Sequence, residues 1–145
     1  MDEFGGGDKS LTGEAQAKAA IGLLDKDLTG EIIAAAIDVH RELGPGLMES
    51  AYQASMCREL TLRRVAFRSQ LDLPLEYKGV RLDCGYRIDL LVDDRVLVEL
   101  KSVERVLPVH EAQLITYLRL SAVHVGLLIN FNVPTLRRGI VRRIL

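Results

Sequence analysis

The chain has 145 residues, is 48% hydrophobic and carries a formal net charge of -1. This length and hydrophobic content suffice for one globular core, and the charge excludes a protein that coats nucleic acid by bulk electrostatics. No apolar run approaches the roughly 20 residues of a membrane span, and the amino terminus lacks the basic, hydrophobic start of a signal peptide. We therefore expect one cytoplasmic domain without a membrane partner.

The first 27 residues are expected to form a flexible tail, followed by a single domain over residues 28–145. Residues 1–10 are polar and rich in glycine, so they cannot bury enough apolar surface to become ordered. Residues 13–25 have the composition of a short, marginal helix, which Gly22 weakens.

Two helices are predicted next. Thr29 is the expected N-cap of the first, and the Gly-Pro-Gly sequence at residues 44–46 ends it. The second is expected over residues 47–64, with Glu49 in its first turn and Tyr52 facing the core. A carboxylate at this position is favoured by the helix dipole by about 0.3–1 kcal/mol, which alone could explain Glu49.

Alternating apolar residues then predict a strand over residues 66–77, ending in a tight turn at Lys78-Gly79. Pro74 lacks a backbone donor, so this strand is expected to lie at an edge or to be irregular there. Pairing the apolar residues across the turn gives the register Tyr77–Val80, Leu75–Leu82, Leu73–Cys84 and Leu71–Tyr86.

A second hairpin is predicted by two strongly alternating segments, residues 86–92 and 95–103, on either side of an Asp-Asp turn. A two-residue loop would set one strand's apolar side chains against the other's polar ones, so we expect a three-residue loop, Asp93–Arg95. The resulting register is Ile88–Leu100, Leu90–Val98 and Val92–Val96.

This register also places Asp89 opposite Glu99 and Arg87 opposite Lys101 on the polar face. Directly opposed side chains start about 5 Å apart at Cβ, where like charges are unfavourable. Mg²⁺ would suit the gap, because it prefers oxygen ligands and is commonly held by one or two carboxylates. Lys101, on the same side of the strand as Glu99, could orient or deprotonate a water molecule.

The remaining segments complete an α/β pattern. Pro108 introduces a predicted helix over residues 109–121, and Gln113 and Tyr117 lie on one side of it, where we expect them to border the cleft beside Glu99. The apolar run at residues 123–131 is typical of a central strand covered on both faces. Residues 139–145 are expected to form a last edge strand.

Asp89 followed by Glu99-Leu100-Lys101 on consecutive strands resembles the D…(D/E)-x-K core of the PD-(D/E)XK nuclease superfamily. The upstream segment L-G-P-G-L-M-E-S-A-Y matches the pattern that gives the GxxExxY protein family its name, through Gly46, Glu49 and Tyr52. Three further segments are similar in sequence and spacing, so that the resemblance covers roughly residues 28–145: Y-K-G at 77–79, H-E-A-Q-L-I-T-Y-L from 110 and G-L-L-I-N-F from 126. The resemblance implies a restriction-endonuclease-like α/β core with a mixed β-sheet flanked by helices.

The same resemblance implies a nuclease that depends on Mg²⁺ or Mn²⁺ and hydrolyses phosphodiester bonds in nucleic acid. It assigns metal binding to Asp89, Glu99, Glu49 and the Leu100 carbonyl, catalysis to Lys101 together with these carboxylates, and substrate contact to Gln113 and Tyr117. The alternative is a catalytically silent binding or assembly module, in which the charged residues form a structural salt-bridge network. The choice between DNA and RNA, and the formation of a homo-oligomer, stay open.

Overall fold

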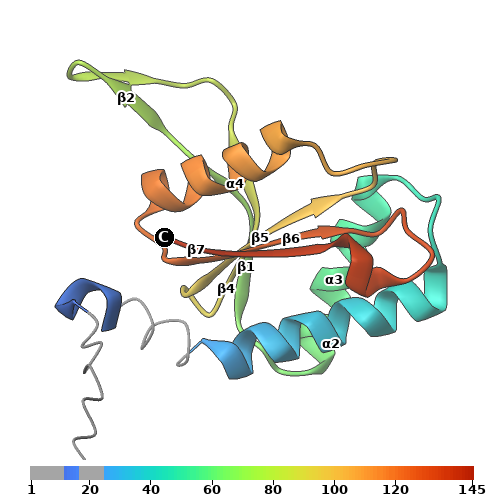
Figure 1. Cartoon of the computed structure of the whole chain (residues 1–145). Helices are drawn as coiled ribbons and strands as arrows, with labels where there is room; N and C mark the ends of the chain where they lie inside the picture. Colours follow the sequence, from blue (N-terminus) through green and yellow to red (C-terminus); the bar gives the residue numbers. More distant parts are fainter. Residues whose placement is uncertain (1–11, 17–24) are drawn as a thin grey trace, which may run out of the picture.

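The computed structural model describes residues 12–16 and 25–145, and in it a mixed five-stranded sheet lies between helices (Figure 1). Most of the predicted tail lies outside the described residues. After a helical turn at residues 13–16, the elements are α2 (Lys26–Leu43), α3 (Glu49–Leu62), β1 (Phe67–Asp72), β2 (Leu75–Tyr77), β3 (Val80–Leu82), β4 (Arg87–Val92), β5 (Val96–Lys101), α4 (Pro108–Ser121), β6 (Val125–Asn130), the 3₁₀ helix η1 (Leu136–Gly139) and β7 (Ile140–Ile144).

The main sheet has the strand order β1-β4-β5-β6-β7, and β2 pairs only with β3 in a separate two-stranded sheet. Neighbouring strands of the main sheet are antiparallel except β5 and β6, which run parallel because α4 crosses over between them. Every residue of β6 is buried, as expected for a central strand. No helix among the described residues is long and apolar enough to cross a membrane.

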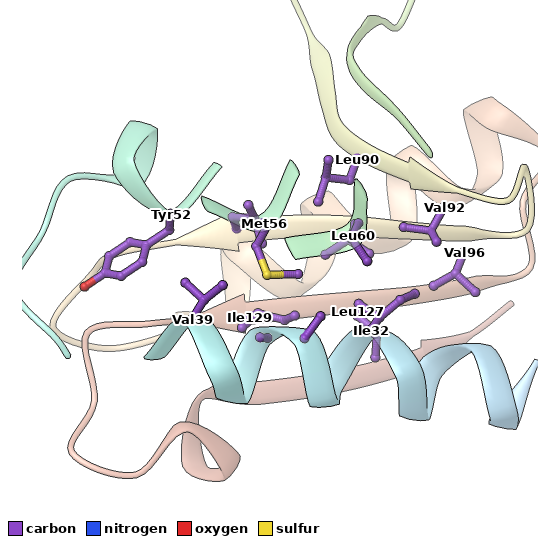
Figure 2. Packing of buried hydrophobic residues seen from close by; sticks show 14 of the residues in the cluster. Ile32, Val39, Tyr52, Met56, Leu60, Leu90, Val92, Val96, Leu127 and Ile129 are labelled. Carbon is purple, nitrogen blue, oxygen red and sulfur yellow. The ribbon is translucent and has the colours of Figure 1, made fainter. Parts of the chain in front are cut away.

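Two apolar clusters hold the layers together, one on each face of the sheet. On one face, α2 and α3 pack against alternate residues of β4, β5 and β6, with Ile32, Met56 and Leu60 fully buried (Figure 2). On the other face, Leu114 and Leu118 of α4 cover the remaining residues of these strands. The alternation of strand side chains thus fills both clusters.

Several predicted elements are confirmed. The first helix ends at Leu43 and Gly44 follows it with φ 68°, while α4 begins at Pro108. The β4–β5 register pairs Leu90 with Val98 and Val92 with Val96, which gives the predicted three-residue loop. Asp93 and Asp94 in that loop are both left-handed.

The expected N-cap at Thr29 is wrong. The helix begins one turn earlier, with Asp25 at the N-cap and Lys26 as the first helical residue. Thr29 is buried inside the first turns, and its hydroxyl donates to the Lys26 carbonyl at 3.0 Å. A threonine whose hydroxyl binds a carbonyl one turn back is compatible with a helix interior, so its residue type did not mark the boundary.

The long outer strand predicted over residues 66–77 is split. The turn at Lys78-Gly79 pairs Leu75 with Leu82 as predicted, but Leu71 pairs with Ile88 rather than with Tyr86. Pro74 interrupts one strand and Gly85, at φ 73°, interrupts the other. The β2–β3 hairpin therefore projects beyond the main sheet (Figure 1).

The predicted pairing of Ile88 with Leu100 is also wrong. Ile88 packs in the cluster under α4, whereas Leu90 and Leu100 pack in the cluster under α2 and α3. Side chains two apart on a regular strand share a face, so β4 must depart from regular geometry between Ile88 and Leu90. The residue at the departure is Asp89.

Candidate active site

Asp89 and Glu99 lie beside one another where β4 and β5 stop pairing. The ladder between these strands ends at Leu90–Val98. Beyond it, the Asp89 backbone N–H donates to Glu99 Oε1 at 3.2 Å, and the Leu100 N–H donates to Asp89 Oδ2 at 2.8 Å. Each carboxylate thus reaches across to the backbone of the other strand, and the two acids are interlocked in the opening.

The two carboxyl groups are in an environment that disfavours their charges. Burial raises the pKa of Glu99 to about 8, and the neighbouring charge of Asp89 acts in the same direction. Burial also raises the pKa of Asp89, and the charge of Glu49 adds to this increase. The hydrogen bond from the Leu100 N–H acts in the opposite direction and lowers the pKa. A cation between two such groups would favour the ionised form of both.

Lys101 lies at the end of β5, partly buried, and its charge partly offsets the pKa increase of both Asp89 and Glu99. Among the described residues, however, no ion pair joins Lys101 to either carboxylate. The charged residues therefore do not form the salt-bridge network that the alternative interpretation predicted.

Asn130, which the sequence analysis missed, fixes the chain just after Lys101. It is paired with Lys101 in the β5–β6 ladder and is almost fully buried. Its Oδ1 accepts from the Val103 N–H at 3.0 Å and its Nδ2 donates to the Val103 carbonyl at 2.9 Å. The available signal was a polar residue at the end of an otherwise apolar central strand.

Tyr52 holds the loop that leads into Glu49. Its hydroxyl donates to the Gly44 carbonyl at 2.6 Å and accepts from the Leu47 N–H at 3.2 Å. Its ring stacks on Phe131 with the centroids 4.4 Å apart. The tyrosine of the G-x-x-E-x-x-Y segment is therefore a core residue that fixes the start of α3, as the sequence analysis favoured.

A cleft of about 480 Å³ opens beside Asp89, between α3 and the strands. Gln53 of α3 donates to the Asp89 carbonyl at 3.0 Å, while its Oε1 is buried without a partner. The sequence analysis missed both Gln53 and Gln70 of β1. The lining residues are Glu49, Ser50, Gln53, Ala54, Gln70, Asp89 and Leu100.

The acidic residues fit a divalent cation only in part. Within residues 12–16 and 25–145, no three His, Cys, Asp or Glu side chains are close enough to hold a metal ion together. Mg²⁺ needs fewer protein ligands, because one or two carboxylates suffice when water and substrate phosphates complete its coordination. Asp89 and Glu99 supply two such carboxylates, and metal ligation by these residues, by Glu49 and by the Leu100 carbonyl stays a prediction.

Gln113 and Tyr117 form a hydrogen-bonded pair on α4, with Gln113 Nε2 donating to the Tyr117 hydroxyl at 2.7 Å. Tyr117 is buried, and burial together with the charges of Glu99 and Asp89 raises its pKa. The hydrogen bond from Gln113 lowers the pKa but does not cancel this increase. Tyr117 is thus on the side of the carboxylates rather than in bulk solvent. Neither Gln113 nor Tyr117 is among the residues that line the cleft beside Asp89, so the expectation that they border a common cleft is not confirmed, and contact of this pair with substrate stays a prediction.

Comparison with known proteins gives one family. The sequence profile of the PD-(D/E)XK nuclease superfamily matches residues 26–144, a region that includes Asp89, Glu99 and Lys101. No curated protein and no solved structure gives a significant match. The mixed five-stranded sheet with flanking helices agrees with the restriction-endonuclease-like α/β fold of that superfamily. The chain therefore belongs to the PD-(D/E)XK nuclease superfamily.

Proposed function

We propose that this protein is a nuclease that hydrolyses phosphodiester bonds in nucleic acid with the help of Mg²⁺ or Mn²⁺. The observation that carries the proposal is the interlocked pair of Asp89 and Glu99 in the opening between β4 and β5. Both groups are destabilised as anions, and no ion pair within the described residues compensates either of them. An arrangement that is unfavourable in the protein alone is expected where a cation is the missing partner.

Each residue has a distinct role in the proposed reaction. Asp89 and Glu99 would hold the cation together with the Leu100 carbonyl, and Glu49 would add negative charge from the start of α3. A bound Mg²⁺ or Mn²⁺ would stabilise the negative charge that develops on the phosphoryl group. Lys101, as an ammonium group, would orient the attacking water by a hydrogen bond and offset negative charge on the phosphoryl group. The proton that the water loses passes to solvent, and the leaving oxygen takes one up from solvent. The water oxygen bonds to phosphorus as the bond to the leaving oxygen breaks.

Gln113 and Tyr117 are assigned to the substrate. Their amide and hydroxyl groups come from α4, which packs on the opposite face of the sheet from α3. Hydroxyl and amide groups commonly contact phosphate oxygens and sugars, and such contacts position a strand without reading its sequence. This assignment leaves open whether the substrate is DNA or RNA.

Incubation with single-stranded, duplex and branched DNA and RNA tests the proposal. The purified protein should cleave at least one of these substrates in Mg²⁺ or Mn²⁺, and EDTA should stop the reaction, because the carboxylates alone cannot stabilise the transition state. Absence of metal-dependent cleavage across the panel would contradict the proposal. Binding without cleavage would instead support a catalytically silent binding module.

A further inference from the structure

Gln70 has an unusual backbone conformation for its position. It lies inside β1, yet its φ is +52°. The other non-glycine residues with positive φ in the described part of the chain all lie at turns or helix ends: Arg64, Lys78, Asp93, Asp94 and Ala122. A left-handed conformation is unfavourable for a long side chain, and strain of this kind gathers at functional sites.

The distortion at Gln70 falls directly opposite Asp89. The β1–β4 register runs from Phe67–Val92 to Asp72–Arg87 and lacks one pair, Gln70 with Asp89. Beyond this point, Leu71 and Ile88 pack under α4. The left-handed residue is therefore located where the side chains of both strands change from one face of the sheet to the other.

The Gln70 side chain acts on the Asp89 carboxylate itself. It lines the same cleft as Asp89, and it opposes the burial that raises the pKa of the Asp89 carboxylate. The Leu100 N–H binds the same carboxylate from β5. Asp89 thus has a bound partner on β5 and an amide across the cleft on β1, and a carboxylate has enough acceptor sites to bind a cation as well.

We propose that Gln70 is a positioning residue, whose left-handed backbone and side-chain amide orient the Asp89 carboxylate to bind a divalent cation. This inference rests on the proposed function. Partners that orient a metal ligand typically contribute 10–100-fold to metal affinity. A glutamine that served only to reverse the strands would contribute nothing to that affinity.

Two variants distinguish the effect of the left-handed backbone of Gln70 from the effect of its side-chain amide. Gln70→Gly removes the amide and relieves the left-handed conformation, so in EDTA it should melt at or above the temperature of the wild type. Gln70→Met keeps the length of the side chain and the left-handed backbone but removes the amide group. The matched control is Lys78→Gly, which relieves a φ of 48° in the distant β2–β3 turn.

The readout is the Mn²⁺ concentration that produces half of the increase in melting temperature. Both Gln70 variants should require at least about tenfold more Mn²⁺ than the wild type, while Lys78→Gly should match it. Wild-type half-saturation in the Gln70 variants would overturn the inference and leave the proposed function intact. No Mn²⁺ response in the wild type would overturn both.

Discussion

Lys101→Ala should reduce the rate of metal-dependent cleavage by about a hundredfold to a thousandfold, the range for loss of one group that stabilises negative charge in the transition state. The reason is that Lys101 is the cationic side chain at the end of β5 beside both carboxylates and is not neutralised by an ion pair with either. The measurement is the single-turnover rate on the best substrate from the nucleic acid panel, at saturating Mn²⁺.

The control for Lys101→Ala is Lys26→Ala, because Lys26 is an exposed lysine at the start of α2. This control should keep the wild-type rate. The Lys101 variant should also keep its response to Mn²⁺ in thermal melts, since an ammonium group cannot ligate the ion. Retention of more than a tenth of the wild-type rate would remove Lys101 from the proposed mechanism.

Glu99→Gln should raise the stability of the metal-free protein, and the gain should grow with pH. The folded-state pKa of Glu99 is about 8, above its ordinary value of 4.5. The protonated form of Glu99 is therefore favoured in the native state. The stability that this group contributes to the wild type is fully present below pH 4.5 and is lost as the pH rises through 8. The difference between these pKa values sets an upper limit of about 5 kcal/mol at 1.36 kcal/mol per pH unit.

Thermal melts in EDTA between pH 5 and pH 9 measure this effect. The variant and the wild type should melt together near pH 5 and separate as the pH rises, because glutamine stays neutral and can still accept from the Asp89 N–H. Glu104→Gln, which neutralises an exposed carboxylate, should show no such separation. A large loss of stability in Glu99→Gln, on the order of 3 kcal/mol as for a broken buried ion pair, would contradict the metal-site interpretation.

The β4–β5 hairpin could be predicted because local rules determine it. Matching apolar side chains across the turn pairs Val92 with Val96. A shift of the register by one residue would place the apolar side chains of one strand beside the polar side chains of the other. The same register predicted Asp89 opposite Glu99, but the ladder ends before that pair, and the two residues meet instead through the hydrogen bond from the Asp89 N–H to Glu99 Oε1. Helix ends marked by Gly44 and Pro108 were equally local, because each residue restricts its own backbone.

The departures from the predicted geometry depend on contacts that are distant in the sequence. Glutamine rarely adopts a left-handed backbone conformation, so the sequence did not predict the change of side-chain face at Gln70 and Asp89. For the same reason it did not predict that Ile88 packs on the other face of the sheet. The contribution of Gln53 requires α3 to pack against β4, 36 residues further along the chain. Side-chain support of this kind follows from tertiary packing rather than from periodicity.

A calorimetric titration of the protein with Mn²⁺ tests the central claim that Asp89 and Glu99 hold a divalent cation. The wild type should bind Mn²⁺ saturably, and Asp89→Asn should lose most of that binding, because the substitution removes one of the two anionic ligands but preserves the side-chain acceptor for the Leu100 N–H. Equal Mn²⁺ binding by the two proteins, or no saturable binding by the wild type, would contradict the claim.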